Sequence, residues 1–313
     1  MAVSSVSPRD DAVRSDQRSG ESDVAAAPKG AAGRGKSGEV RTLTARIFVI
    51  VLLLGLVIWT LLPFFVTVVS SLQTRGEVFA HPGFWPRDPS IASYKEVLGS
   101  ETFLRTLMNS IIVGLGTTAL TLVIAVPAAY AFARFRFRGR HFLLLFMLIP
   151  RLIPNLTLMV PLYRLAVELG AIDKRMTLII VYTGMLLPLA VWLLVGFYEK
   201  VPRDIEEAAS VDGASTFNRI RYIVLPLSVP ALITIAVLAF REAWNEFTLV
   251  LVLTTTPGSR TLPYELFAMQ GIEGIPNYPA QAAFALITVV PFVLVYMRIE
   301  KYVVQGITSG AVK

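Results

Sequence analysis

Residues 207–226 read Glu-Ala-Ala-Ser-Val-Asp-Gly-Ala-Ser-Thr-Phe-Asn-Arg-Ile-Arg-Tyr-Ile-Val-Leu-Pro, a polar stretch between two long apolar segments. Just before it, Pro202 and Asp204 are typical of a helix start. Within it, Asp212 followed by Gly213 is typical of a helix end, because glycine tolerates the left-handed conformation that stops a helix. We therefore predict a short helix over about residues 205–211.

A second helix is expected directly after Gly213. Ser215 or Thr216 can cap its first turn, and its apolar residues Phe217, Ile220 and Val224 share one face. Leu225-Pro226 is expected to close it. The stretch is therefore predicted to be a compact bent helix pair, and a rigid amphipathic loop at the membrane interface is the simpler alternative.

The rest of the chain is strongly apolar. Hydrophobic residues make up 54% of its 313 residues, and windows of about 18 or more apolar residues are typical of membrane-spanning helices. We predict an all-α integral membrane protein with six transmembrane helices, at about 47–72, 107–133, 141–167, 177–197, 227–253 and 281–303. Because six is even, both termini are expected on the same side.

Basic residues indicate which side that is. Lys and Arg are concentrated in the segments that share a side with the N-terminus, most densely as Arg134, Arg136, Arg138 and Arg140. The positive-inside rule therefore predicts that both termini and the loop over 200–226 are cytoplasmic and that the protein lies in the cell membrane. The net charge of +7 requires no nucleic acid partner, because these cations flank the spans and suit the phosphate headgroups of membrane lipid.

Residues 1–46 are predicted to be a disordered cytoplasmic tail, because they contain few large apolar side chains. Gly30 to Ser37 fits the nucleotide-binding pattern G-x4-G-K-S, yet the sequence indicates neither the strand before it nor the helix after it that would shape a phosphate site. A nucleotide-binding protein or membrane-bound enzyme using this segment is the alternative from another functional class. The chain has no cysteine, and His81 and His141 are far apart, so no metal or catalytic site is expected.

Polar residues within the predicted spans are candidates for a solute path, because they are costly in a bilayer and usually functional. The third span contains Arg151 and Asn155 among several prolines, which free backbone carbonyl groups. The fifth span carries Arg241, Glu242, Trp244, Asn245 and Glu246. One interpretation is a cavity with hydrogen-bonding groups and an aromatic ring, suited to a polyhydroxylated ligand. The other is an internal Arg–Glu pair with contacts to a partner subunit, and the sequence favours neither.

The spacing of residues 207–226 matches the motif E-A-A-x3-G-x9-I-x-L-P of ABC importer permeases. Further similarities are Asn109-Ser110, the runs over 129–134, 243–246 and 260–263, and the C-terminal run over 304–313. The chain thus resembles the smaller subunit of the carbohydrate-uptake (maltose-type) branch of ABC transporter permeases. The resemblance implies the type I ABC importer permease fold. It also implies a coupling site for an ATPase at Glu207, Ala208, Ala209, Asp212, Gly213, Ile223, Leu225 and Pro226.

The same resemblance implies the partners. A second, homologous permease would complete the path, and two ATPase subunits would bind ATP and Mg²⁺, so that no cofactor is expected in this chain. An extracytoplasmic binding protein would deliver the sugar, a di- or oligosaccharide. The loop between the last two spans would contact that protein through Pro257, Gly258, Ser259, Gly274 and Tyr278.

The resemblance also divides the chain. A permease domain over 47–305 would be followed by a cytoplasmic tail over 306–313 that reaches the ATPase interface. Another solute, such as glycerol phosphate, is the alternative substrate, because the basic Arg151 and Arg241 would suit an anion.

Overall fold

The computed structural model describes residues 35–80, 85–270 and 276–308. The chain forms two compact units, 1–59 and 60–313, and the described residues of the first are helical. Several expectations lie outside the described residues: those on most of the predicted tail (1–34), on the first part of the nucleotide-like pattern from Gly30, on His81, on Gly274 and on residues 309–313.

Helix α1 (Gly35–Ser71) begins well before the predicted first span. Residues 35–46 are therefore helical, which corrects the prediction that the tail is disordered up to residue 46. Lys, Glu and Arg are good helix formers, and a helix that is already nucleated extends into them at little cost. The pattern ending in Lys36-Ser37 is thus followed by a helix after all, and this helix continues into an apolar candidate span, Ala45–Ser71.

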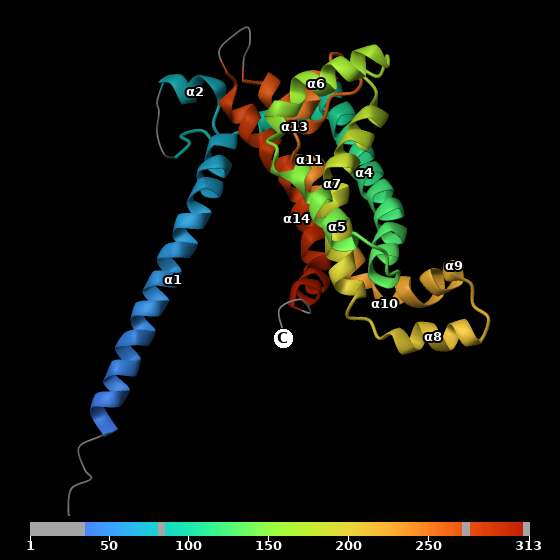
Figure 1. The fold of residues 1–313 in the computed structure, drawn as a ribbon. Helices are drawn as coiled ribbons and strands as arrows, with labels where there is room; N and C mark the ends of the chain where they lie inside the picture. The colour runs from blue at the N-terminus through green and yellow to red at the C-terminus, as the bar shows by residue number, and fades with distance from the viewer. Residues whose placement is uncertain (1–34, 81–84, 271–275, 309–313) are drawn as a thin grey trace, which may run out of the picture. The chain divides into compact units, whose positions relative to one another are not determined.

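All regular structure in the described part of the second unit is helical (Figure 1). After α1 the elements are α2 (Arg75–Ala80), α3 (Ala92–Gly99), α4 (Glu101–Arg134), α5 (Arg140–Leu148), the 3-10 turn η1 (Ile149–Leu152), α6 (Asn155–Glu168), α7 (Arg175–Tyr198), α8 (Arg203–Val211), α9 (Thr216–Arg219), the π-helical turn η2 (Ile220–Val224), α10 (Leu225–Leu227), α11 (Val229–Asn245), α12 (Thr248–Leu253), α13 (Leu262–Ala268) and α14 (Tyr278–Thr308).

Three helices among the described residues, α1, α4 and α7, are long and apolar enough to cross a membrane. Two bent helix pairs pass the same test: Arg140–Leu152 with Asn155–Glu168, bent by 93°, and Thr216–Leu227 with Val229–Asn245, bent by 80°. Tyr278–Leu294 is a shorter apolar segment. Each predicted span overlaps one of these regions, and the count of six complete crossings stays a prediction.

The third and fifth predicted spans are broken rather than continuous, which corrects their prediction as single helices. The third divides at η1, where Pro150 and Pro154 cannot donate backbone hydrogen bonds. The fifth ends at Asn245 and resumes as α12 after Glu246, whose carboxylate accepts hydrogen bonds from the backbone N–H groups of Leu249 and Val250. Hydropathy alone does not register either break.

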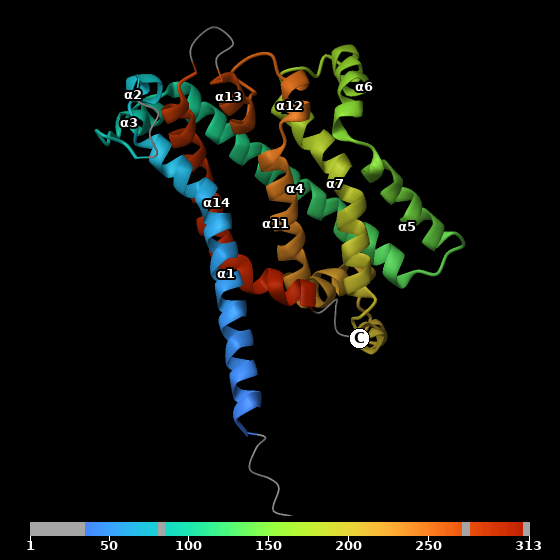
Figure 2. The same ribbon diagram turned by 90° about the vertical axis from the view of Figure 1, so that its left-hand side faces the viewer.

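Helix α4 packs along α7 and α11 (Figure 2). A Cβ atom on Gly114 of α4 would lie 2.7 Å from the Phe240 ring, and one on Gly116 would lie 2.6 Å from Ile179. Small side chains let helices approach this closely, which is a main source of attraction between helices in a membrane. The small buried residues of α4 follow one face of the helix: Thr106, Ser110, Gly114, Thr117, Thr121, Ala125, Ala129 and Ala133.

Candidate functional site: coupling helices, hollow and outer loop

The predicted helix pair is present as α8 and α9, which lie at the end of the bundle where α10 is found (Figure 1). Helix α8 is followed by Gly213 with a φ of 83°, as the prediction of a left-handed stop requires. The backbone N–H of Ala214 donates to the Ala209 carbonyl at 2.9 Å, which completes this helix end. Ser215 caps α9, because its hydroxyl accepts from the backbone N–H of Asn218 at 3.3 Å.

The second helix does not close at Leu225-Pro226, which corrects that expectation. The backbone N–H of Leu225 bonds to the Ile220 carbonyl five residues back, in a π-helical turn, and the helix continues through Pro226 to Leu227. A π turn changes the register of the hydrogen bonds, so the chain can pass a proline without ending the helix. The helical segment Thr216–Leu227 therefore leads directly into the 80° bend before α11.

Large apolar side chains are exposed on the helix pair. Val211 is 88% exposed, Phe217 67% and Tyr222 66%. Val211 ends α8, Phe217 lies in α9 and Tyr222 in η2. Large exposed apolar side chains on a polar element are candidates for a docking surface. The expected ATPase-coupling residues share this element and are exposed or partly buried: Glu207, Ala208, Ala209, Asp212, Gly213, Ile223, Leu225 and Pro226.

Glu206, the residue before Glu207, is buried and holds α8 on α4. Its carboxylate accepts hydrogen bonds from Arg134 Nε at 2.7 Å and from the Tyr130 hydroxyl at 2.8 Å. Arg134 Nη2 lies 2.6 Å from the same carboxylate, and the two charged side chains are only 9% and 5% exposed. Arg134 also donates to the Val201 carbonyl at 3.1 Å. We call Glu206, Arg134 and Tyr130 the Glu206 brace.

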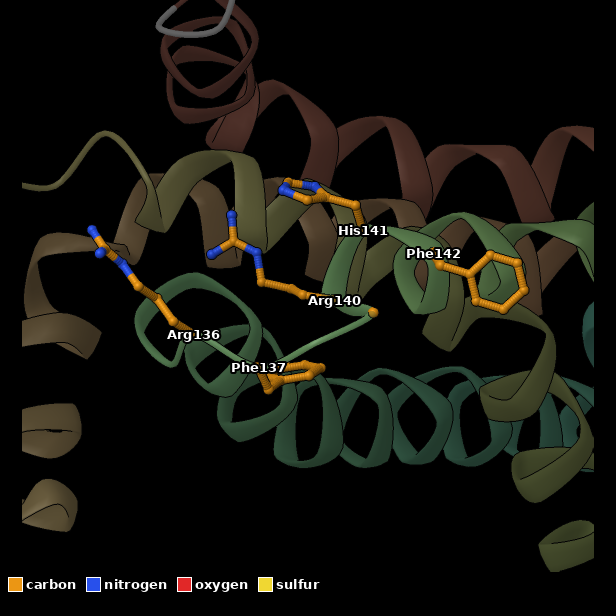
Figure 3. Close-up of a pocket in the computed structure, with 6 residues that line it drawn as sticks. Arg136, Phe137, Arg140, His141 and Phe142 are labelled. Carbon is orange, nitrogen blue, oxygen red and sulfur yellow. The ribbon is translucent and has the colours of Figure 1, made fainter.

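The four arginines over residues 134–140 do not all face outward, which corrects the expectation that they meet headgroups as a group. Arg134 belongs to the Glu206 brace, and Arg140 pairs with Glu199 at 2.8 Å. No carboxylate among the described residues lies within ion-pair distance of Arg136 or Arg138. Figure 3 shows Arg136, Arg140 and His141 beside a hollow of about 390 Å³, which Phe137 and Phe142 also line.

Part of the set of candidate path residues does come together, at an open hollow beside η1. Arg151 of η1, Asn155 of α6 and Glu242 of α11 line two hollows that share these residues, the larger of about 260 Å³. Glu246, at the break before α12, and Tyr182 of α7 line the smaller hollow. The breaks in the third and fifth spans thus bring polar residues from separate segments to one place.

The polar groups of this hollow are bonded to one another. Glu242 Oε1 lies 2.6 Å from Arg241 Nη2 and 3.9 Å from Arg151 Nη2. Glu246 accepts a hydrogen bond from the Tyr182 hydroxyl at 2.8 Å. Glu242 therefore stands beside both arginines, Glu246 is bonded to Tyr182, and the set can both donate and accept hydrogen bonds.

Trp244 does not join this hollow, which corrects the expectation that its ring faces a ligand. It is 8% exposed and packs in the hydrophobic core with Leu262 and Phe284, and its ring centroid is 5.3 Å from that of Phe240. On a helix, residue 244 points away from the face that carries 242 and 246. Asn245 is exposed, and its side chain donates to the Arg241 carbonyl at 2.9 Å.

The outer loop over 254–261 is held in place by Asp173. The Asp173 carboxylate accepts hydrogen bonds from the backbone N–H groups of Thr255 at 2.7 Å and Thr256 at 2.9 Å, and from the Thr255 hydroxyl. The Ser259 hydroxyl donates to the Asp173 carbonyl. Asp173 has a φ of 60°, in the left-handed region that aspartate tolerates better than most residues. Burial would raise the pKa of Asp173, but the hydrogen bonds from Thr255 and Thr256 outweigh it and hold that pKa below its ordinary value.

Helix α4 holds the same loop from the other side. The Asn109 amide donates to the carbonyls of Gly258 at 3.0 Å and Arg260 at 2.9 Å. The Ser110 hydroxyl accepts from the backbone N–H of Leu262 at 2.9 Å. These bonds explain how a segment rich in turn formers is ordered.

The expected binding-protein contacts divide into two groups. Pro257, Gly258 and Tyr278 are exposed, so they are available to a partner. Ser259 is 6% exposed and bonded to Asp173, which corrects its assignment as a contact and makes it part of the loop's attachment.

Residues 121–309 match the model of a protein family described as the binding-protein-dependent transport system inner membrane component. The matched segment contains the Glu206 brace, the hollow and the outer loop. The chain belongs to this family. It is an ABC importer permease and a multi-pass membrane protein, and it belongs to the carbohydrate-uptake branch that the motif spacing indicated.

Curated relatives cover most of the permease. It is 35% identical over 245 residues to the sulfoquinovosyl glycerol transport system permease protein SmoH of Agrobacterium fabrum, a match that covers 78% of this chain and 86% of the relative. It is also 35% identical over 226 residues to the trehalose/maltose transport system permease protein MalG of Thermococcus litoralis, with 72% and 81% covered.

The fold of the permease is found in a solved transporter. A chain in the crystal structure of a bacterial ABC transporter involved in the import of the acidic polysaccharide alginate superposes with a TM-score of 0.72 at 24% identity, over 83% of this chain and 97% of that one. The predicted all-helical ABC importer permease fold is therefore confirmed.

Sequence reasoning missed three residues whose bonds join distant segments around the candidate site. Glu206 stood next to the matched motif position Glu207 without being assigned a role. Asp173 carries no sequence signal of its own, and Tyr182 is one tyrosine within an apolar span. Only the distance between segments far apart in the chain gives these residues their partners.

Proposed function

We propose that the permease is the translocation subunit of an importer for a di- or oligosaccharide. The observation that carries this proposal is the open hollow where Arg151, Asn155 and Glu242 meet. Sugars present many hydroxyl groups, which both donate and accept hydrogen bonds, and a mixed set of amide, guanidinium and carboxylate groups matches them. Relatives named as permeases for sulfoquinovosyl glycerol and for trehalose and maltose support a sugar.

The charge of the hollow argues against an anion such as glycerol phosphate. A site that selects a phosphate concentrates cations without nearby carboxylates. Here Glu242 lies within 2.6 Å of Arg241 and 3.9 Å of Arg151, so the arginines that would suit an anion are already opposed. A hydroxyl-rich solute fits this mixed set of groups better than a small phosphate ester does.

We propose that α8 and α9 receive the energy for transport from ATPase subunits that bind ATP and Mg²⁺ in place of this chain. The exposed Val211, Phe217 and Tyr222 would fill an apolar groove of the ATPase, and Glu207 would lie at the edge of that contact. Closure of the ATPase dimer would then push α8 as a rigid body, because the Glu206 brace fixes it to the bundle. No bond is made or broken in the permease itself.

A second permease subunit would complete the path. The bent segment formed by α5 and α6 exposes many large apolar side chains, among them Phe142 at 69%, Leu152 at 82% and Leu156 at 71%. Part of this surface faces lipid and part would face the partner, which closes the hollow at Arg151. In both permease subunits the cytoplasmic side would be the side of α8. Arg136 and Arg138 would face anionic headgroups there.

An extracytoplasmic binding protein would dock at the opposite end, on the outer loop. The exposed Pro257, Gly258 and Tyr278 are the expected contacts, and the bonds to Asp173 and Asn109 would hold the loop ready for docking. Preordering a loop lowers the entropy that its partner must overcome on binding.

Uptake measurements test the proposal. Cells that lack the permease should lose ATP-dependent uptake of one di- or oligosaccharide from a labelled panel, and expression of the intact chain should restore it. Unchanged uptake of every sugar in the panel, together with loss of uptake of an organic phosphate, would show that the substrate class is wrong while leaving the transport role intact.

A further inference from the structure

Helix α4 is hydrogen-bonded at one end to α8 and at the other end to the outer loop. At the first end the Glu206 brace joins Tyr130 and Arg134 to α8. At the second end Asn109 and Ser110 hold the carbonyls of Gly258 and Arg260 and the N–H of Leu262. Residues 109 and 134 are about 38 Å apart along the helix axis, at a rise of 1.5 Å per residue.

We propose that α4 is a connecting rod that transmits motion between the ATPase-docking helix and the binding-protein-docking loop, with Glu206, Arg134 and Asn109 as its positioning residues. The inference rests on the proposed function, since it assigns the two ends of the rod to those partners. Docking of a loaded binding protein at Gly258 and Pro257 would move the end of α4 at Asn109, and α4 would displace α8 at its other end.

The attachments are strong enough for this role because they are buried and specific. The Glu206 and Arg134 side chains are 5% and 9% exposed, and Asn109 is 4% exposed. Removing either partner of this buried ion pair would leave the other charge buried and unpaired, which is strongly destabilising. Asn109 uses both hydrogens of its amide on carbonyls of the loop, which fixes the loop in position and in orientation.

The rod itself is held straight by its neighbours. α4 is helical without interruption from Glu101 to Arg134, although it contains Pro127. A proline removes one backbone hydrogen bond and favours a kink, but Ala125 and Ala129, on either side, are fully buried in the core formed with α7 and α11. Packed secondary elements of this kind can carry coupling between two distant sites.

Other paths between the two surfaces are weaker. The α7 helix reaches α8 through a turn at Lys200 and Val201 rather than through a continuous helix. The fifth span is bent by 80° and broken again at Glu246. Asp173 holds the outer loop from the connection between α6 and α7, so it anchors the loop without being part of α4. It therefore offers a matched control that loosens the same loop through a different anchor.

The test uses the complete transporter in lipid nanodiscs with its loaded binding protein. The measured quantity is the ratio of ATPase rate at saturating binding protein to the rate without it. Asn109→Ala and Glu206→Gln should each lower this ratio by about fivefold, a common size for coupling between sites. The ratio of the double variant should be no lower than that of the more impaired single variant. Asp173→Asn should raise the concentration of binding protein needed for half-stimulation and leave the ratio at saturation near that of wild type.

Two results would overturn the rod. One is effects of Asn109→Ala and Glu206→Gln that multiply, because independent effects mean that the two ends are not in series. The other is a loss of the saturating ratio in Asp173→Asn that equals the loss in Asn109→Ala, because then only loop order matters. A wild-type complex that no loaded binding protein stimulates would instead overturn the proposed function, and the inference with it.

A milder variant guards against misfolding. Tyr130→Phe removes only the hydroxyl bond to Glu206 and keeps the ring in the core. A reduced stimulation ratio in Tyr130→Phe, with normal assembly, supports the rod even if Glu206→Gln fails to assemble. An unchanged ratio in Tyr130→Phe combined with an unchanged ratio in assembled Asn109→Ala counts against it.

Discussion

Glu206 and Arg134 form a buried ion pair at 2.6 Å between segments that are 72 residues apart in the chain. The next residue, Glu207, is exposed. Two adjacent glutamates of α8 therefore have different surroundings: Glu206 attaches α8 to α4, and Glu207 faces solvent. This division follows from helix geometry, because consecutive residues of a helix point about 100° apart.

Replacing Glu206 should destabilise the permease, whereas replacing Glu207 should not. Glu206→Ala leaves Arg134 buried without its carboxylate, which costs about 3–5 kcal/mol for a buried pair broken on one side. Glu207→Ala removes an exposed side chain and is expected to stay within about 0.5 kcal/mol of wild type. Thermal unfolding of the purified permease in one detergent measures both. Equal melting temperatures for the two variants would contradict the assignment.

Gly213 should be required for coupling rather than for insertion. Its φ of 83° is accessible to glycine at no steric cost, whereas proline is fixed near −65°. Gly213→Pro should therefore leave the permease in the membrane and disconnect ATP hydrolysis from sugar uptake. Gly139→Pro is the matched control, because Gly139 is another glycine with a left-handed φ, 85°, and lies outside the helix pair. Uptake and ATPase rate are measured in the same vesicles, and normal uptake by Gly213→Pro would rule the role out.

The close contact between α4 and α11 should not tolerate a larger residue. A Cβ atom on Gly114 would lie 2.7 Å from the Phe240 ring, and such overpacking typically costs about 1–3 kcal/mol. Gly196→Ala in α7 is the matched control, because a Cβ atom there meets nothing within 4 Å and alanine favours the helix. Gly114→Ala should lower the melting temperature, and Gly196→Ala should leave it unchanged or raise it. A lower melting temperature for both would point to a general effect of helix glycines.

The attachment of the outer loop should weaken in acid. Because the pKa of Asp173 is held below its ordinary value of 3.8, the carboxylate stabilises the folded loop at pH values above 3.8. That stabilisation is lost as the pH falls through the lowered folded-state pKa. Hydrogen exchange of the Thr255 and Thr256 amides should therefore show less protection at low pH, after correction for intrinsic rates. Asp173→Asn should remove this pH dependence, and a dependence that persists in the variant would assign it to another group.

The hollow and the core can be separated by two neighbouring substitutions in α11. Glu242→Gln leaves Arg151 and Arg241 without their opposing charge, so the half-saturating concentration of sugar should rise by about tenfold, as loss of a charged hydrogen bond predicts. Trp244→Phe lies in the core and should lower stability without changing that concentration. Transport kinetics and thermal unfolding of both variants check this. A change in sugar affinity for Trp244→Phe alone would return the ring to the path.

Local signals in the sequence were sufficient for the parts of the fold that local chemistry controls. Gly213 after Asp212 marked the end of α8, Ser215 marked the cap of α9, and apolar windows located the spans. In each case the decisive interaction lies within a few residues, so the neighbouring sequence is enough to predict it. The motif spacing around Glu207 likewise sufficed for the family. The same local view overextended the disordered tail past Gly35 and drew the third and fifth spans as continuous helices.

What the tertiary structure decided are the partners of polar groups that are distant in sequence. Glu206 became an anchor only because Arg134 and Tyr130 reach it from another helix, and Asp173 became a latch only because Thr255 and Thr256 pass within hydrogen-bonding distance. The placement of Trp244 in the core and of Glu242 in the hollow depends on how α11 is turned against α4 and α7. The sequence by itself determined the membrane class, the family and the local helix ends. The roles of its buried charges depend on long-range packing, because a charge in a low-dielectric interior is defined by what lies beside it.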